Sequence, residues 1–166
     1  MGGVDIALSR GLVAVVDSVD APLVLPYKWH AIPGRHTYYA RTSVPHPFRA
    51  DKSYPLAMHR LILGLPFGDR RHGDHIDGNG LNNRRSNLRI VTRRQNAMNR
   101  RGDDGSSSQY KGVYLYKNGS WQSYIYAKGK RHHLGYFAEE VDAALAHDEA
   151  ALQLHGPYAK FNFPRP

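Results

Sequence analysis

Apolar and polar positions alternate in short runs through the first 50 residues, a pattern typical of β-strands separated by turns. Apolar runs occupy 12–16, 21–29 and 37–43, and polar or glycine- and proline-containing segments lie between them. We therefore expect three short strands in this region. Trp29 and the nearby tyrosines are expected to be packing residues of a small sheet.

The hydrophobic period changes at residues 56–65, where apolar residues recur at close to helical spacing and Gly64 lies near the end, so we expect a helix. The following stretch, GDHIDGNGLNNRRSNLRIVTRRQN, runs from Gly73 to Asn96. GDHI predicts a strand end, DGNG a turn and NLRIV a second strand. Thr92 and Gln95 fit a capping box, which predicts a helix from Arg93. The predicted motif is strand, loop, strand, helix.

The segment YKGVYLYKNGSWQSYIYAKGKRHHLGYF predicts three strands with turns at Asn118-Gly119 and Lys128-Gly129. Alternation places tyrosines on one face and apolar residues on the other. The expected tyrosine face holds Tyr114, Tyr116, Tyr124 and Tyr126, and the expected apolar face holds Val113, Leu115 and Ile125.

A helix follows the third strand and ends at Gly156-Pro157. Its apolar stripe is predicted to be Val141, Ala144, Leu145 and Leu152. This helix should cover the apolar face of the sheet and leave the aromatic face exposed. His147 and His155 on the helix are expected to be structural.

The whole pattern predicts an α+β fold with four parts. These are an N-terminal β region (1–55), a central strand-loop-strand-helix core (56–101), a linker of composition GDDGSSSQ (102–109), and a C-terminal sheet with one helix (110–166).

Charge points to a polyanionic partner. The 166 residues carry a net charge of +9, with a pI of about 9.9, and nucleic acid is the first candidate for such a basic chain. Residues 84–101 contain seven arginines and no acid. In the C-terminal module, 110–135 is basic and 136–149 is acidic, so one face should attract DNA. A basic protein without such a partner remains the alternative from charge alone.

Other classes of protein are disfavoured by what the sequence lacks. The chain has no cysteine, which excludes disulfides and thiolate metal sites and favours an intracellular setting. No apolar run approaches the roughly 20 residues of a membrane span. Asp5 and Arg10 interrupt the region where a signal peptide would be apolar. We expect a soluble, cytoplasmic protein.

Asp74 and His75 are the first candidates for chemistry. The Asp74 carboxylate is a hard oxygen ligand suited to Mg²⁺, and Asn96, about one turn into the predicted helix, adds an amide oxygen. A histidine with an ordinary pKa of about 6.5 is largely neutral at physiological pH, so His75 can take a proton from water. Neighbouring arginines should favour its neutral form. Strand alternation directs Asp74 and His75 to opposite sides, so they flank one substrate only if the strand end twists.

Residues 58–100, MHRLILGLPFGDRRHGDHIDGNGLNNRRSNLRIVTRRQNAMNR, closely resemble the HNH endonuclease family, specifically its phage and intron-encoded homing type with a ββα-metal core. The resemblance implies that His75 is the general base and Asn87 orients it. It further implies that Asp74 and Asn96 hold one divalent cation, Mg²⁺ or Mn²⁺. Asn96 stands where the family name has its third histidine.

Several polar residues near this motif are assigned other roles. Asp77, Asn79, Asn82 and Asn83 are expected to satisfy the turn, and His72 to be a loop residue. His59 is expected to be packed or to face phosphate.

Residues 110–163 look like the DNA-binding domain of plant ethylene-response factors, on the strength of YKGV, HHLGYF and HGPYAKFNF. That domain reads the major groove with its sheet, but tyrosines and a histidine fall here at several of its reading positions, so its base preference does not transfer. The expected DNA contacts are the basic residues Arg84, Arg85, Arg89, Arg93, Arg94 and Arg100 of the core, and Tyr114, Tyr116, Lys117, Tyr124, Tyr126, Lys128, Arg131 and His133 of the module.

The expected function is a site-specific, metal-dependent DNA endonuclease of the HNH homing type. One active site per chain predicts a monomer that nicks one strand of double-stranded DNA and leaves 5′-phosphate and 3′-hydroxyl ends. No protein partner and no membrane is implied. The alternative is a non-catalytic, sequence-specific DNA-binding regulator.

Overall fold

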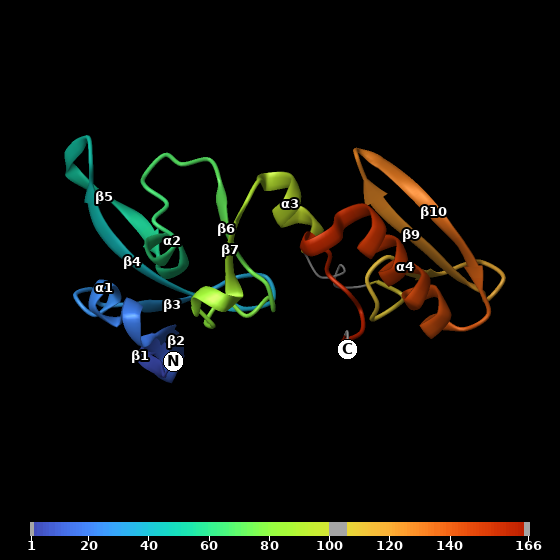
Figure 1. The fold of residues 1–166 in the computed structure, drawn as a ribbon, viewed down its shortest axis with the longest axis horizontal. Helices are drawn as coiled ribbons and strands as arrows, with labels where there is room; N and C mark the ends of the chain where they lie inside the picture. The colour runs from blue at the N-terminus through green and yellow to red at the C-terminus, as the bar shows by residue number, and fades with distance from the viewer. Residues whose placement is uncertain (1, 100–105, 165–166) are drawn as a thin grey trace. The chain divides into compact units, whose positions relative to one another are not determined.

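The computed structural model describes residues 2–99 and 106–164 (Figure 1). The chain divides into two compact units, residues 1–94 and residues 95–166. Within the described ranges, no helix has the length and apolar character needed to cross a membrane.

The first unit contains three small antiparallel sheets. β1 (Gly3–Ala7) pairs with β2 (Val13–Asp17), and β3 (His30–Pro33), β4 (Tyr38–His46) and β5 (Arg49–Ala57) form a meander in the order β3-β4-β5. β6 (His72–His75) pairs with β7 (Leu88–Val91). Single-turn 3-10 helices lie at Ser9–Gly11, Ser18–Asp20 and Arg85–Asn87.

Two short α-helices, α1 (Ala21–Val24) and α2 (Met58–Ile62), accompany these sheets, and α3 (Arg93–Met98) follows β7 across the boundary between residues 94 and 95. The structure confirms the expected strands at 12–16 and 37–43 and the expected helix within 56–65. It also confirms the order strand, loop, strand, helix, formed by β6, the 76–87 loop, β7 and α3 (Figure 1).

The expected strand at 21–29 is wrong, because this run forms α1 and an irregular segment. Pro22 lies in the first turn of α1, a position where its missing N–H is not needed. Ala21 and Val24 are buried while Leu23 is exposed, which is helical and not strand periodicity. Trp29 is buried as expected, and its Nε1 donates a hydrogen bond of 2.8 Å to the carbonyl of Val24.

One hydrophobic core joins the N-terminal strands of the first unit to α2 and β7. It draws on the first 40 residues and on α2 and β7 together, and its buried members are Ile6, Leu8, Ala14, Val16, Val24, Trp29, Ala31, Ala40, Met58, Ile62 and Leu88. The strands β1 to β4 therefore fold with the segment that carries Asp74 and His75.

The second unit is a three-stranded antiparallel sheet and a helix. β8 (Val113–Leu115), β9 (Trp121–Ala127) and β10 (Lys130–Phe137) lie in the order β10-β9-β8, and α4 (Glu140–His155) packs across one face (Figure 1). A 3-10 turn, Gly156–Tyr158, follows α4. The strands, turns and covering helix expected from the sequence are confirmed.

The apolar stripe expected on α4 is largely wrong. Val141, Leu145 and Leu152 are exposed, and of the four expected residues Ala144 is buried. The buried stripe is Ala143, Ala144, His147, Ala151 and His155. Leu115, expected on the covered face of the sheet, is also exposed.

Candidate functional site

Asp74 and His75 lie at the end of β6, and both are buried, with 7% and 5% of their surface exposed. In the β6-β7 register Asp74 faces Arg89, and the Arg89 Nε donates a 2.7 Å hydrogen bond to the Asp74 Oδ2. The Arg89 side chain is 16% exposed, so this ion pair is largely shielded from water. The structure thus pairs two residues to which the sequence gave separate roles.

The His75 ring contacts Asn83, a residue that is fully buried. The His75 Nε2 lies 3.2 Å from the Asn83 Oδ1, and the Asn83 Nδ2 donates to the Gly80 carbonyl at 3.4 Å. Because the amide nitrogen of Asn83 is used on Gly80, its oxygen faces the ring and accepts from Nε2. We assign the proton of neutral His75 to Nε2 on this basis, which makes Nδ1 the basic nitrogen.

Burial keeps His75 neutral. It lowers the pKa of His75, and the hydrogen bond that the ring donates to the Asn83 Oδ1 and the charges of Asp77 and Asp74 oppose this effect without cancelling it. The arginines expected to favour the neutral form are not the cause. A neutral imidazole is the form required of a general base.

A second histidine packs against His75. The rings of His59 and His75 are 4.9 Å apart in an edge-to-face arrangement, and Tyr39 lies within 6.1 Å of both rings. Burial, with smaller contributions from His75, Arg60 and Arg41, lowers the pKa of His59 to about 3. His59 is therefore a packed, uncharged residue, which agrees with the packing alternative of the sequence interpretation.

Asn87 acts on the chain beside His75 and not on the ring. Its backbone carbonyl accepts from the Ile76 N–H at 2.9 Å, and its Oδ1 accepts from the Asp77 N–H at 3.0 Å. Its Nδ2 donates to the Asp77 Oδ1 at 2.9 Å and to the Asn82 carbonyl at 2.8 Å. Any orientation of His75 by Asn87 therefore passes through the backbone of residues 76 and 77.

Asp77 organises the turn, as expected from the sequence. Its carboxylate accepts from the Asn79 N–H at 2.7 Å and the Asn82 Nδ2 at 2.8 Å. Burial opposes ionisation of Asp77, but these donors and Asn87 outweigh it and lower the pKa of Asp77.

The N-terminal strands hold the loop that carries Asn83. The Val15 N–H donates to the Leu81 carbonyl at 2.9 Å, and the Val15 carbonyl accepts from the Asn83 N–H at 2.8 Å. The neighbouring residue Gly80 admits no side chain, because a Cβ there would lie 2.4 Å from the Tyr38 carbonyl oxygen. The position of the His75 partner thus depends on β2 and β4.

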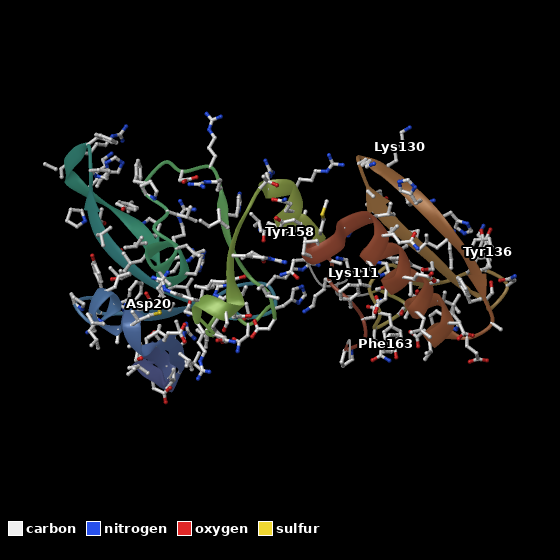
Figure 2. All side chains as sticks on the ribbon, in the orientation of Figure 1. Asp20, Lys111, Lys130, Tyr136, Tyr158 and Phe163 are labelled. Atoms are coloured by element: carbon white, nitrogen blue, oxygen red, sulfur yellow. The ribbon has the colours of Figure 1, made fainter. Side chains whose placement is uncertain are left out.

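The arginines expected to bind DNA divide into two groups. Arg84, Arg93 and Arg94 are exposed. Arg85 makes a paired contact with the buried Asp20, with distances of 2.8 and 2.7 Å, and Arg89 is paired with Asp74. Figure 2 labels Asp20 within the first unit. Arg100 lies outside the described residues.

The donors expected to hold a metal are hard oxygens, a chemistry that suits Mg²⁺ or Mn²⁺. Asp74 offers a buried carboxylate at the end of β6. Asn96 lies on α3 and belongs to the second unit, so its place beside Asp74 stays a prediction. Among the described residues, no group of three or more His, Asp or Glu side chains is suited to a metal ion, but the expected donor pair is smaller than that.

The sheet of the second unit presents an aromatic face opposite α4. Tyr114 and Tyr124 are stacked, with ring centroids 4.9 Å apart and planes at 4°, and Tyr126 meets Tyr124 edge-on at 5.6 Å. The Arg131 guanidinium lies 5.0 Å from the centre of the Tyr124 ring. These expected DNA contacts therefore lie together on one face.

Tyr136 belongs to the same face, although the sequence interpretation missed it. It is 52% exposed, and its ring lies 4.8 Å from both Tyr116 and His133. Simple alternation from His133 would place Tyr136 on the opposite face of the sheet. A register shift between His133 and Gly135 places it on the same face as His133. Figure 2 shows Lys130 and Tyr136 toward opposite ends of β10.

Residues 57–98 match the profile of the HNH endonuclease family. This segment begins at the last residue of β5 and contains α2, β6, β7 and α3, so it includes Asp74, His75, Asn83 and Asn87. The chain carries an HNH endonuclease domain. Over most of its length, the chain is 29% identical to an uncharacterized HNH endonuclease of Acanthamoeba polyphaga mimivirus, a match of 157 residues that covers 92% of this chain and 76% of the relative.

Partial similarity to plant proteins accompanies the HNH domain and involves the C-terminal region. An APETALA2-like protein 2 of Oryza sativa is 45% identical over 65 residues, which cover 39% of this chain and 15% of the plant protein. The dehydration-responsive element-binding protein 2D of Arabidopsis thaliana is 36% identical over 87 residues, 51% of this chain and 42% of the relative. An HNH domain and a region similar to plant factors therefore occur in one chain.

Proposed function

We propose that this HNH nuclease is a site-specific, metal-dependent DNA endonuclease of the homing type that nicks one strand of a duplex. The observation that supports this most is His75. It is buried, its Nε2 is bonded to Asn83, and it adjoins the Asp74 carboxylate within the segment that matches the HNH family.

In the proposed reaction, the Nδ1 of His75 takes a proton from a water molecule as that water attacks the phosphorus of a DNA phosphodiester. The Asn83 oxygen continues to accept the Nε2 proton, which keeps the ring oriented while it becomes positively charged. The bond from phosphorus to the 3′ oxygen then breaks with its electron pair on that oxygen, which takes a proton from solvent water, so the products carry 5′-phosphate and 3′-hydroxyl ends.

Asp74 and Asn96 would hold one divalent cation, Mg²⁺ or Mn²⁺, which when bound supplies stabilisation of negative charge on the departing 3′ oxygen. Arg89 fixes the Asp74 carboxylate through its Oδ2. This contact limits the rotation of the Asp74 carboxylate and would orient it as a ligand of the cation.

Binding and selection of DNA are assigned to different surfaces. The exposed Arg84, Arg93 and Arg94 would contact backbone phosphates, which gives affinity without sequence information. The aromatic face of the second unit's sheet, which carries the tyrosines and Arg131, would contact bases in the major groove and select the site. With one His75 per chain, a monomer cuts one strand per binding event.

Supercoiled plasmid incubated with the protein tests this proposal. Nicked circles should form with Mg²⁺ or Mn²⁺ and not with EDTA. The new 5′ ends should accept labelled phosphate from a kinase only after a phosphatase has removed the existing 5′-phosphate. Binding of plasmid without a nick under all metal conditions would instead identify a non-catalytic DNA-binding protein.

A further inference from the structure

The β4-β5 hairpin ends in an unusually exposed aromatic residue. Its turn, Pro47-Phe48, lies between the paired residues His46 and Arg49, and 83% of the Phe48 surface is exposed. In Figure 1 this turn is the teal end of the β4-β5 ribbon. The fold buries little of this ring, so most of its apolar surface is available for burial against a partner.

Other aromatic rings pack against the turn. Phe67 lies 4.7 Å from His46 and 4.7 Å from Tyr54, while Phe48 lies 6.2 Å from Phe67. The Phe48 N–H also donates to the His46 Nδ1 at 3.1 Å. The Phe48 ring therefore lies on a cluster of rings that meet edge to face, so little ordering is needed when it binds.

This cluster of rings is tied to the loop that leads into the active site. The Arg60 guanidinium donates to the carbonyls of Arg71 at 2.9 Å, Pro66 at 3.1 Å and Asp69 at 3.2 Å. This loop carries Phe67 and continues directly into β6, which ends at His75. The hairpin tip and the catalytic strand thus belong to one braced structure.

Charge around the hairpin selects the kind of partner. Residues 28–57 contain five Lys or Arg side chains and a single carboxylate, Asp51. Arg41, Arg49 and Lys52 are all exposed on the two strands of the hairpin. A rigid apolar tip on a basic ribbon fits a duplex, in which cations contact phosphates and an apolar side chain enters between base pairs.

We propose that Phe48 is a wedge that inserts between adjacent base pairs of the bound DNA and unwinds the duplex near the cleavage site. This inference rests on the proposed function, since it requires DNA as the partner. The nearby Arg49 and Lys52 hold the flanking phosphates, and Phe67 limits how far the tip can bend back.

Relaxation of a plasmid by a type IB topoisomerase in EDTA tests the wedge without cleavage. The probes are that plasmid and a 40-base-pair duplex of mixed sequence for affinity. At equal occupancy, the wild-type protein should leave negatively supercoiled topoisomers after its removal, and Phe48→Ala should leave almost none. Phe48→Ala should also bind the short duplex at least about fivefold more weakly, the lower range for loss of one aromatic-base contact. Phe48→Trp should restore the topoisomer shift.

Leu25→Ala is the matched control, because Leu25 is 63% exposed in the same unit and lies outside the aromatic cluster. It should behave as wild type. A topoisomer shift that is the same for Phe48→Ala and wild type overturns the wedge. If Phe48→Ala leaves that shift unchanged but alters self-association in sedimentation, the wedge is likewise overturned, and Phe48 contacts a second copy of the chain instead. If the wild-type protein nicks plasmid with Mg²⁺ but does not unwind it, the wedge falls and the endonuclease stands. If it neither binds nor nicks DNA, both fall.

Discussion

The side-chain amide of Asn83 determines which nitrogen of His75 is basic. Asn83 accepts from Nε2 because its own Nδ2 is directed to Gly80, so the ring presents Nδ1 as its base. Spacing in the sequence identified Asp74 and His75 as neighbours at a strand end. It could not identify Asn83, because the contact depends on Val15 of β2, which is 68 positions away along the chain.

We predict that Asn83→Ala slows DNA cleavage by about 10- to 100-fold, the usual effect of removing a partner that orients a reactive ligand or base. DNA affinity should hardly change, because Asn83 is fully buried. Single-turnover nicking and anisotropy with labelled duplex give the two values. Asn82→Ala is the control, since the Asn82 amide bonds Asp77 and not His75. Equal slowing by both variants would assign the effect to the turn as a whole.

The lowered pKa of His59 predicts acid sensitivity of the first unit. The folded-state pKa is about 3, against an ordinary value of 6.5, so between these values the unfolded chain binds a proton that the folded chain does not. Stability should therefore fall as the pH is lowered through this window, with a slope from His59 of up to about 1.4 kcal/mol per pH unit.

Urea unfolding of the metal-free protein at several pH values measures this slope. Trp29 fluorescence in a Trp121→Phe background reports on the first unit. His59→Gln should reduce the slope by nearly one proton, whereas His30→Gln, at an exposed site, should not. His75 also has a lowered pKa and should account for part of the remaining slope. A slope unaffected by His59→Gln would mean that His59 is solvated in solution.

Arg89 and Arg94 should differ in kind, although the sequence assigned both to DNA. Arg94→Ala removes an exposed cation and should reduce the dependence of log affinity on log salt by about 0.9. Arg89→Met removes the guanidinium that pairs with the buried Asp74 carboxylate and should destabilise the first unit, by about 3 kcal/mol, with an unchanged salt slope. Salt titrations of binding, with denaturant unfolding of each variant, separate the two. A reduced salt slope for Arg89→Met would place Arg89 on phosphate.

At the scale of elements, the failures of periodicity on β10 and α4 have identifiable causes. On β10, the bulge at Gly135 changes which residues face outward, and strand alternation contains no signal for it. On α4, small side chains permit close packing on the sheet, and His155 is buried because its Nε2 bonds the Tyr126 carbonyl at 2.9 Å. A rule that seeks valine and leucine therefore selects the wrong face.

A pair of substitutions tests the buried face of α4. Ala144 is fully buried, so Ala144→Leu should overpack the interface with the sheet and destabilise the second unit by about 1 to 3 kcal/mol. Leu145→Ala removes a side chain that is 51% exposed and should change stability by less than about 0.5 kcal/mol. Urea unfolding followed by Trp121 fluorescence measures both. The reverse order of effects would restore the stripe expected from the sequence.

At the scale of the whole molecule, the candidate catalytic residues and the aromatic sheet belong to different units. Asp74 and His75 lie in residues 1–94, and the tyrosine face lies in residues 95–166. Sequence composition predicted a boundary at the GDDGSSSQ segment (102–109), of which 102–105 lie outside the described residues, whereas the two compact units divide between residues 94 and 95. It gave no sign that β1 to β4 share a core with the HNH domain, because those contacts are between positions far apart in the chain.

The most direct test of the central claim compares wild-type protein and His75→Ala on supercoiled plasmid with Mg²⁺, at protein concentrations that give equal DNA occupancy. We predict a nicking rate lower by about 100- to 10,000-fold for His75→Ala, because the general base is lost, with nearly unchanged affinity for the same DNA. Nicking by His75→Ala at the wild-type rate, or a loss of activity fully explained by weaker binding, would contradict the assignment of His75 as the base.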